Sequence, residues 1–114
     1  MDILQILKIV AALATVATGC ISLVRPRSIR GFTGLEAAGP RGITEIRAVL
    51  GGLFIGLGLA PFLLAAPQAY QVLGIAYLAI GAVRAVSMVF DRSVMSSNTV
   101  SLAVEIVFGI LLVL

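Results

Sequence analysis

Four charged residues, Glu45, Arg47, Arg84 and Glu105, lie inside long apolar stretches of this chain. Such side chains usually face other helices or a cavity, because lipid does not solvate them. Two acids and two bases can form a buried ion-pair network, hold a polar headgroup, or act as general acid and base. In the stretch TEIRAVLGG, Glu45 and Arg47 are two residues apart and do not face each other on a helix. We therefore expect each to meet a different neighbour, with Arg84 and Glu105 as the expected partners.

The positions of these residues along the chain predict similar depths in a membrane. Arg84 and Glu105 are equally distant from the centre of the polar connection around residues 91–97. In an antiparallel hairpin, equal distances along two helices place both residues at the same level. Counting from the turn at 66–68 puts Arg47 near the level of Arg84, and Glu45 half a turn closer to the membrane surface. The sequence thus predicts that the four charges converge near one face of the membrane.

Small residues indicate which helix faces pack closely in a membrane. Glu105 lies on a face with small residues, and Tyr77 shares the face of Arg84, which makes Tyr77 a further candidate binding residue. Gly52 and Gly56 form a GxxxG pair on the face of Glu45, and we expect them to join two copies of the chain or a larger complex. The predicted helix-packing glycines are Gly51, Gly52, Gly56, Gly74, Gly81 and Gly109.

The composition defines the elements that must position these side chains. Of 114 residues, 61% are hydrophobic and only 11% are charged, whereas a soluble domain carries about 25% charged residues. About 20 apolar residues cross a bilayer as a helix. We predict an all-α polytopic membrane protein, a single four-helix up-down-up-down transmembrane bundle. The expected helices are 3–24, 40–66, 68–90 and 98–114, with an interfacial loop over 25–39.

The arginines predict the orientation of the chain. Most of them fall in or beside the loops at 25–39 and 91–97, whereas the opposite side offers only Lys8. Cytoplasmic loops carry an excess of Lys and Arg. The sequence therefore predicts a multi-pass protein of the bacterial inner membrane with both loops in the cytoplasm and both termini outside.

Several classes of function lack the residues they need. Histidine is absent and Cys20 is the only cysteine, so we expect no metal site and no cofactor, and we assign no catalytic residue. No basic stripe with interleaved aromatic residues supports nucleic-acid binding. Small multidrug exporters have a similar length, but they carry a glutamate in the first helix, where this chain has none. Proton-coupled transport is therefore the least favoured function.

Three interpretations of the charged residues stay open. They form a purely structural ion-pair network, or they line a pocket for a lipid headgroup, an amphipathic small molecule or a partner helix, or they carry out chemistry. The preferred function is a membrane-embedded binding or accessory protein. The alternative is a small isomerase or cyclase that uses Glu105 or Glu45 as general acid or base. An enzymatic role is not favoured, because no nucleophile or phosphate loop accompanies the carboxylates.

The order of these motifs resembles a known family. TEIRAVLGGLFIGLGL, then GAVRAV with Arg84, then Glu105 in the last helix is similar to a family of small bacterial four-helix membrane proteins, a domain of unknown function. The most specific part is EIRA followed by Gly51 and Gly52. The architecture also resembles that of DoxX-type membrane proteins. The resemblance implies the four-span fold and importance for Glu45 and Arg47, but no particular activity.

Overall fold

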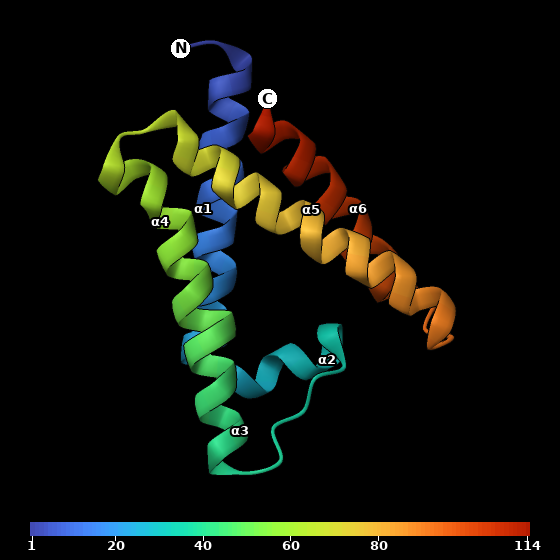
Figure 1. The fold of residues 1–114 in the computed structure, drawn as a ribbon. Helices are drawn as coiled ribbons and strands as arrows, with labels where there is room; N and C mark the ends of the chain where they lie inside the picture. Colours follow the sequence, from blue (N-terminus) through green and yellow to red (C-terminus); the bar gives the residue numbers. More distant parts are fainter. The chain divides into compact units, whose positions relative to one another are not determined.

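The protein is described by a computed structural model that covers residues 1–114 and is all-α, without strands (Figure 1). Its helical elements follow each other with short connections, and the longest irregular segment lies between α2 and α3. The elements are α1 (Ile3–Val24), η1 (Pro26–Ile29), α2 (Arg30–Thr33), α3 (Pro40–Glu45), η2 (Ile46–Leu53), α4 (Phe54–Leu64), α5 (Pro67–Phe90) and α6 (Ser96–Val113).

Four helical stretches are long and apolar enough to cross a membrane. They are Ile3–Val24, Pro40–Leu64, Pro67–Phe90 and Ser96–Val113, with 22, 25, 24 and 18 residues. The second stretch joins α3, η2 and α4 without a break. Each approaches or exceeds the roughly 20 residues that a crossing requires. The chain is therefore a multi-pass membrane protein.

The ends of these helices differ by up to two residues from those expected from sequence. The second stretch ends at Leu64, because Ala65 adopts a left-handed conformation with a φ of 51°. Pro67 is then the first residue of α5, where its missing N–H costs nothing. The last helix starts at Ser96 rather than at residue 98. Met95 before it is extended, and its carbonyl accepts a hydrogen bond from the Thr99 hydroxyl at 3.0 Å.

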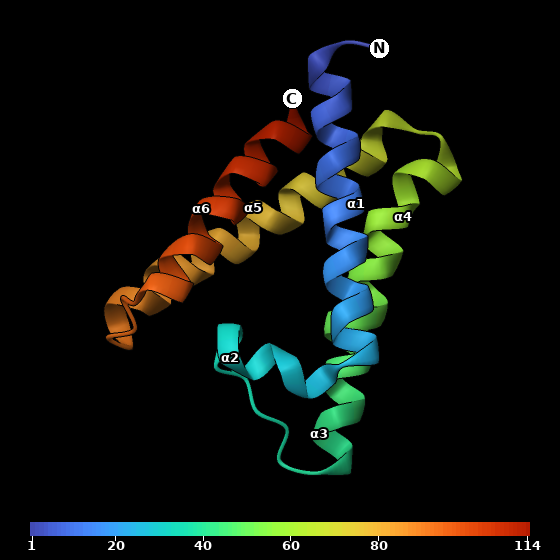
Figure 2. The ribbon, with the colours of Figure 1, turned by 180° about the vertical axis from the view of Figure 1, so that it is seen from behind.

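The chain divides into two compact units, residues 12–65 and residues 1–11 with 66–114. In the first, the α1–α4 unit, α1 lies beside α4 (Figure 2). Gly19 sits directly on the opposing backbone: a Cβ there would lie 2.7 Å from the Gly51 carbonyl oxygen and 2.9 Å from the Ile55 nitrogen. A Cβ on Gly58 would lie 2.8 Å from the Ala12 carbonyl oxygen. These glycines allow the two backbones to touch.

The η2 segment is π-helical, and this winding changes which residues face α1. Its Ile46 and Gly51, five residues apart, are both buried, as expected when hydrogen bonds join residues i and i+5. Gly52 and Gly56 are exposed. A Cβ on Gly56 would meet nothing within 4 Å. Gly51 therefore faces α1 in this unit, whereas Gly52 and Gly56 do not.

The second unit, the α5–α6 unit, contains an antiparallel helix pair with close contact at two glycines. A Cβ on Gly74 would lie 2.9 Å from the Gly109 carbonyl oxygen, and one on Gly109 would lie 2.6 Å from the Leu78 side chain. Gly81 has ordinary contact, with 3.5 Å from its built Cβ to that of Glu105. This packing brings the polar side chains of α5 and α6 into register.

Candidate functional site

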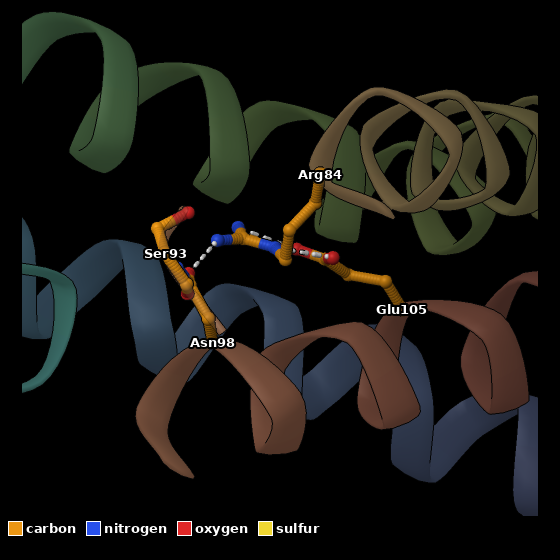
Figure 3. Close-up of polar contacts among 4 residues, drawn as sticks. All are labelled: Arg84, Ser93, Asn98 and Glu105. Atoms are coloured by element: carbon orange, nitrogen blue, oxygen red, sulfur yellow. Dashed lines mark hydrogen bonds and ion pairs between the residues drawn. The ribbon is translucent and has the colours of Figure 1, made fainter. Parts of the chain in front are cut away.

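The polar side chains of the α5–α6 unit meet near the connection between the two helices. Arg84 lies two turns before the end of α5. Glu105 and Asn98 lie on α6, seven residues apart and therefore on the same helix face. Ser93 belongs to the short connection. These four residues form the hairpin site, shown in Figure 3.

Arg84 holds the hairpin site together through three hydrogen bonds. Its Nε donates to Glu105 Oε1 at 2.7 Å, and its Nη2 donates to Oε2 of the same carboxylate at 2.8 Å. Its Nη1 donates to Asn98 Oδ1 at 2.9 Å. Asn98 Nδ2 in turn donates to the Ser93 carbonyl at 2.9 Å. The guanidinium is thus fixed from both sides (Figure 3). On one side it forms a bidentate ion pair with Glu105, and on the other it contacts the Asn98 amide, which is hydrogen-bonded to the connection.

The two charged partners differ in exposure. The side chain of Glu105 is only 10% exposed, whereas that of Arg84 is 31% exposed. Ionised groups are expensive to bury unless they are paired and hydrogen-bonded. Both Glu105 oxygens accept a hydrogen bond from Arg84, so the buried carboxylate is satisfied. Arg84 forms three hydrogen bonds, which leaves two of the five N–H donors of a guanidinium unused.

A pocket of about 510 Å³ opens beside Arg84. Its polar wall combines Arg84 and Asn98 with Ser87 and Ser93. The Ser87 hydroxyl donates to Asp91 at 2.6 Å. The remaining wall is apolar and consists of Ala79, Ile80, Val83 and Met88. The pocket therefore combines hydrogen-bond donors with a hydrophobic surface.

The other predicted site residues make contacts of their own. Glu45 forms an exposed ion pair with Arg41, one turn earlier on α3. Arg47 lines a separate pocket of the α1–α4 unit. Tyr77 lies on α5 and packs edge-on against Phe108, with ring centroids 5.6 Å apart. The structure joins Arg84 to Glu105, while the convergence of all four charged residues stays a prediction.

Sequence reasoning missed two members of the hairpin site. Asn98 lies seven residues before Glu105 and shares its helix face. That spacing was the available signal. Ser93 takes part through its backbone carbonyl, which no side-chain pattern reveals. Arg41 was also missed as the partner of Glu45, although oppositely charged residues four apart on a helix commonly pair.

Four apolar helices and a paired charge within them define an α-helical multi-pass membrane protein. The sequence matches the domain of unknown function DUF4345 over residues 3–114, nearly its whole length. The chain belongs to this family. No curated protein and no solved structure matches it.

Proposed function

We propose that the protein is a membrane-embedded binding protein whose hairpin site holds the polar head of an amphipathic molecule. The observation that supports this function is a fixed arginine with unused N–H donors on the wall of a partly apolar pocket. Ligand sites typically combine an apolar lining with a few fixed polar groups. The hydrophobic wall would take the apolar part of the molecule.

The charge of the hairpin site indicates the chemical class of the polar head group that it would bind. Glu105 balances the charge of Arg84, so the pocket supplies hydrogen-bond donors without an excess positive charge. A neutral or zwitterionic head with carbonyl, hydroxyl or phosphoryl oxygens fits this arrangement better than a small anion does. A lipid and an amphipathic small molecule both meet this description.

The enzymatic alternative has less support from the geometry. Both oxygens of Glu105 accept hydrogen bonds from Arg84, and the side chain is only 10% exposed, so little of the carboxylate is accessible to a substrate. Glu45 is exposed and paired with Arg41. We therefore keep binding as the proposed function.

Filling the pocket tests this function without touching the ion pair. We expect Ala79→Phe to remove a molecule that co-purifies with the wild-type chain, because Ala79 lines the apolar wall and a phenyl ring would occupy the pocket. The measurement is native mass spectrometry of protein extracted in a mild detergent. The wild-type spectrum is expected to show this molecule bound at one copy per chain.

Ala82→Phe is the matched control, because Ala82 is exposed on the same helix but does not line the pocket. It should keep the adduct at the wild-type level. A bare wild-type chain, or an adduct that survives equally in both variants, would count against a ligand in the hairpin site.

We also propose the bacterial inner membrane as the location, with both termini outside and the loops 25–39 and 91–97 in the cytoplasm. The concentration of arginines around these loops supports this orientation. The DoxX-like architecture and the EIRA signature of the family likewise stay predictions. Their support is the order of the motifs along the chain.

A complex of two or more copies is the proposed state of the protein. Gly52 and Gly56 are exposed, and no atom lies within 4 Å of a Cβ built on Gly56. Their small face is therefore free for another helix, and small residues four apart favour such contacts in membranes. A partner helix from another membrane protein would fit the same face.

A further inference from the structure

A second pocket, of about 400 Å³, lies in the α1–α4 unit where α1 ends and α3 passes into η2. It is independent of the hairpin site, since none of its residues belongs to α5 or α6. Most of its polar lining is arginine. The lining residues are Val24, Arg25, Pro26, Arg27, Ser28, Ile43 and Arg47.

The ion pairs of the α1–α4 unit leave this pocket strongly positive. Of its five arginines, Arg30 pairs with Glu36 and Arg41 pairs with Glu45. These are the only two carboxylates between residues 12 and 65. The three arginines without an ion pair, Arg25, Arg27 and Arg47, all line the pocket, and no carboxylate lines it.

Three guanidinium groups around one pocket repel each other unless an anion lies among them. Arginine suits phosphate in particular, because its planar fork donates two parallel hydrogen bonds to two oxygens. We propose that this pocket binds a phosphate-bearing anion through Arg25, Arg27 and Arg47. A carboxylate ligand would satisfy one arginine, whereas the oxygens of a phosphate can satisfy several.

The place of the pocket in the fold favours the headgroup of an acidic phospholipid as the source of the phosphate. Arg25 directly follows the first membrane-spanning helix, and Arg47 lies about 10 Å along the second from its start at Pro40, at 1.5 Å per residue. A helix that starts at the membrane surface places such residues where headgroups meet the hydrocarbon core. Val24 and Ile43 give the same pocket an apolar side. Basic pockets between membrane helices bind acidic headgroups in this way.

A simpler explanation is that the arginines only hold the chain against the membrane surface. In that case any arginine in a loop would contribute equally, and no single lipid would stay bound after extraction. The arrangement of three unpaired arginines around one pocket predicts instead a stoichiometric lipid whose retention depends on particular residues. The two explanations therefore differ in an experiment with charge-matched variants.

The experiment is a titration of the purified, delipidated chain in a mild detergent, followed by native mass spectrometry. The probes are phosphatidylglycerol, which is acidic, and phosphatidylcholine, which is zwitterionic, while equilibrium dialysis measures the binding of inorganic phosphate. We expect one phosphatidylglycerol per chain. We also expect its affinity to exceed that of phosphatidylcholine about tenfold, because only the acidic headgroup leaves the phosphate charge unbalanced.

Arg47→Gln should weaken phosphatidylglycerol binding about tenfold. Arg47→Lys should weaken it less, since lysine keeps the charge but cannot donate two parallel hydrogen bonds. Arg92→Gln removes the same charge from the other loop and should leave binding within about twofold. Circular dichroism checks that each variant is folded.

The outcomes distinguish the source of the phosphate. Lipid binding without phosphate binding identifies a lipid headgroup, and Arg47-dependent binding of inorganic phosphate alone identifies free phosphate. Equal binding of the two lipids, or equal effects of Arg47→Gln and Arg92→Gln, would overturn the proposal.

Discussion

Replacing Arg84 with methionine is expected to lower the free energy of unfolding by about 3 kcal/mol. The substitution removes three hydrogen bonds and leaves Glu105, whose side chain is 10% exposed, without its cation. Breaking a buried ion pair typically costs about 3–5 kcal/mol. The lower end applies here, because 31% of the Arg84 side chain is exposed and solvent screens part of the interaction. Equilibrium unfolding by sodium dodecyl sulfate in mixed micelles provides the measurement.

The double variant Arg84→Met/Glu105→Leu separates the ion pair from the packing around it. Replacing both partners with apolar residues leaves no unpaired charge, so stability should return to within about 1 kcal/mol of the wild type. Arg84→Met alone would then be the less stable of the two. If the double variant were as unstable as the single one, the loss of stability would come from packing and not from the unpaired Glu105 carboxylate.

Gly19→Ala is expected to destabilise the protein by about 2 kcal/mol. The added methyl would lie 2.7 Å from the Gly51 carbonyl oxygen and 2.9 Å from the Ile55 nitrogen, and both are backbone atoms that cannot rotate away. The helices α1 and α4 must therefore move apart, which loosens the whole contact. The same unfolding titration reports the change.

Gly31→Ala is the matched control for this substitution, because it lies on α2 of the same unit and its new methyl would meet nothing within 4 Å. Its stability should equal that of the wild type or exceed it by up to about 1 kcal/mol, since alanine favours a helix over glycine. Equal destabilisation by both substitutions would show that the close contact at Gly19 is absent.

The apolar composition predicts an all-α membrane chain because only a helix satisfies its backbone polar groups in lipid. Loops could be located because proline and arginine interrupt the apolar stretches. Arg84 and Glu105 could be paired by counting from their connection, since a short hairpin fixes the register of its two helices. Each of these inferences depends on residues that are close in sequence.

The π-helical winding of η2 could not be predicted, and it changes the facing of the residues around it. With α-helical spacing, Glu45 shares a face with Gly52 and Gly56, and all three are exposed in the structure, whereas the joint burial of Ile46 and Gly51, five residues apart, reflects the π-helical winding. The close contacts of Gly19 and Gly58 depend on which helices pack together. The sequence of one helix does not determine its partner. Whether the four charges converge is likewise a question of tertiary packing.

Exchanging the two charges tests most directly whether the hairpin site binds a ligand. The double variant Arg84→Glu/Glu105→Arg keeps an ion pair between α5 and α6 but places a carboxylate at the position that lines the pocket. Thermal unfolding and native mass spectrometry are measured on the same sample. We predict a thermal midpoint close to that of the wild type and loss of the co-purified adduct. An adduct retained at the wild-type level would contradict a binding role for Arg84 and leave the pair with a structural role alone.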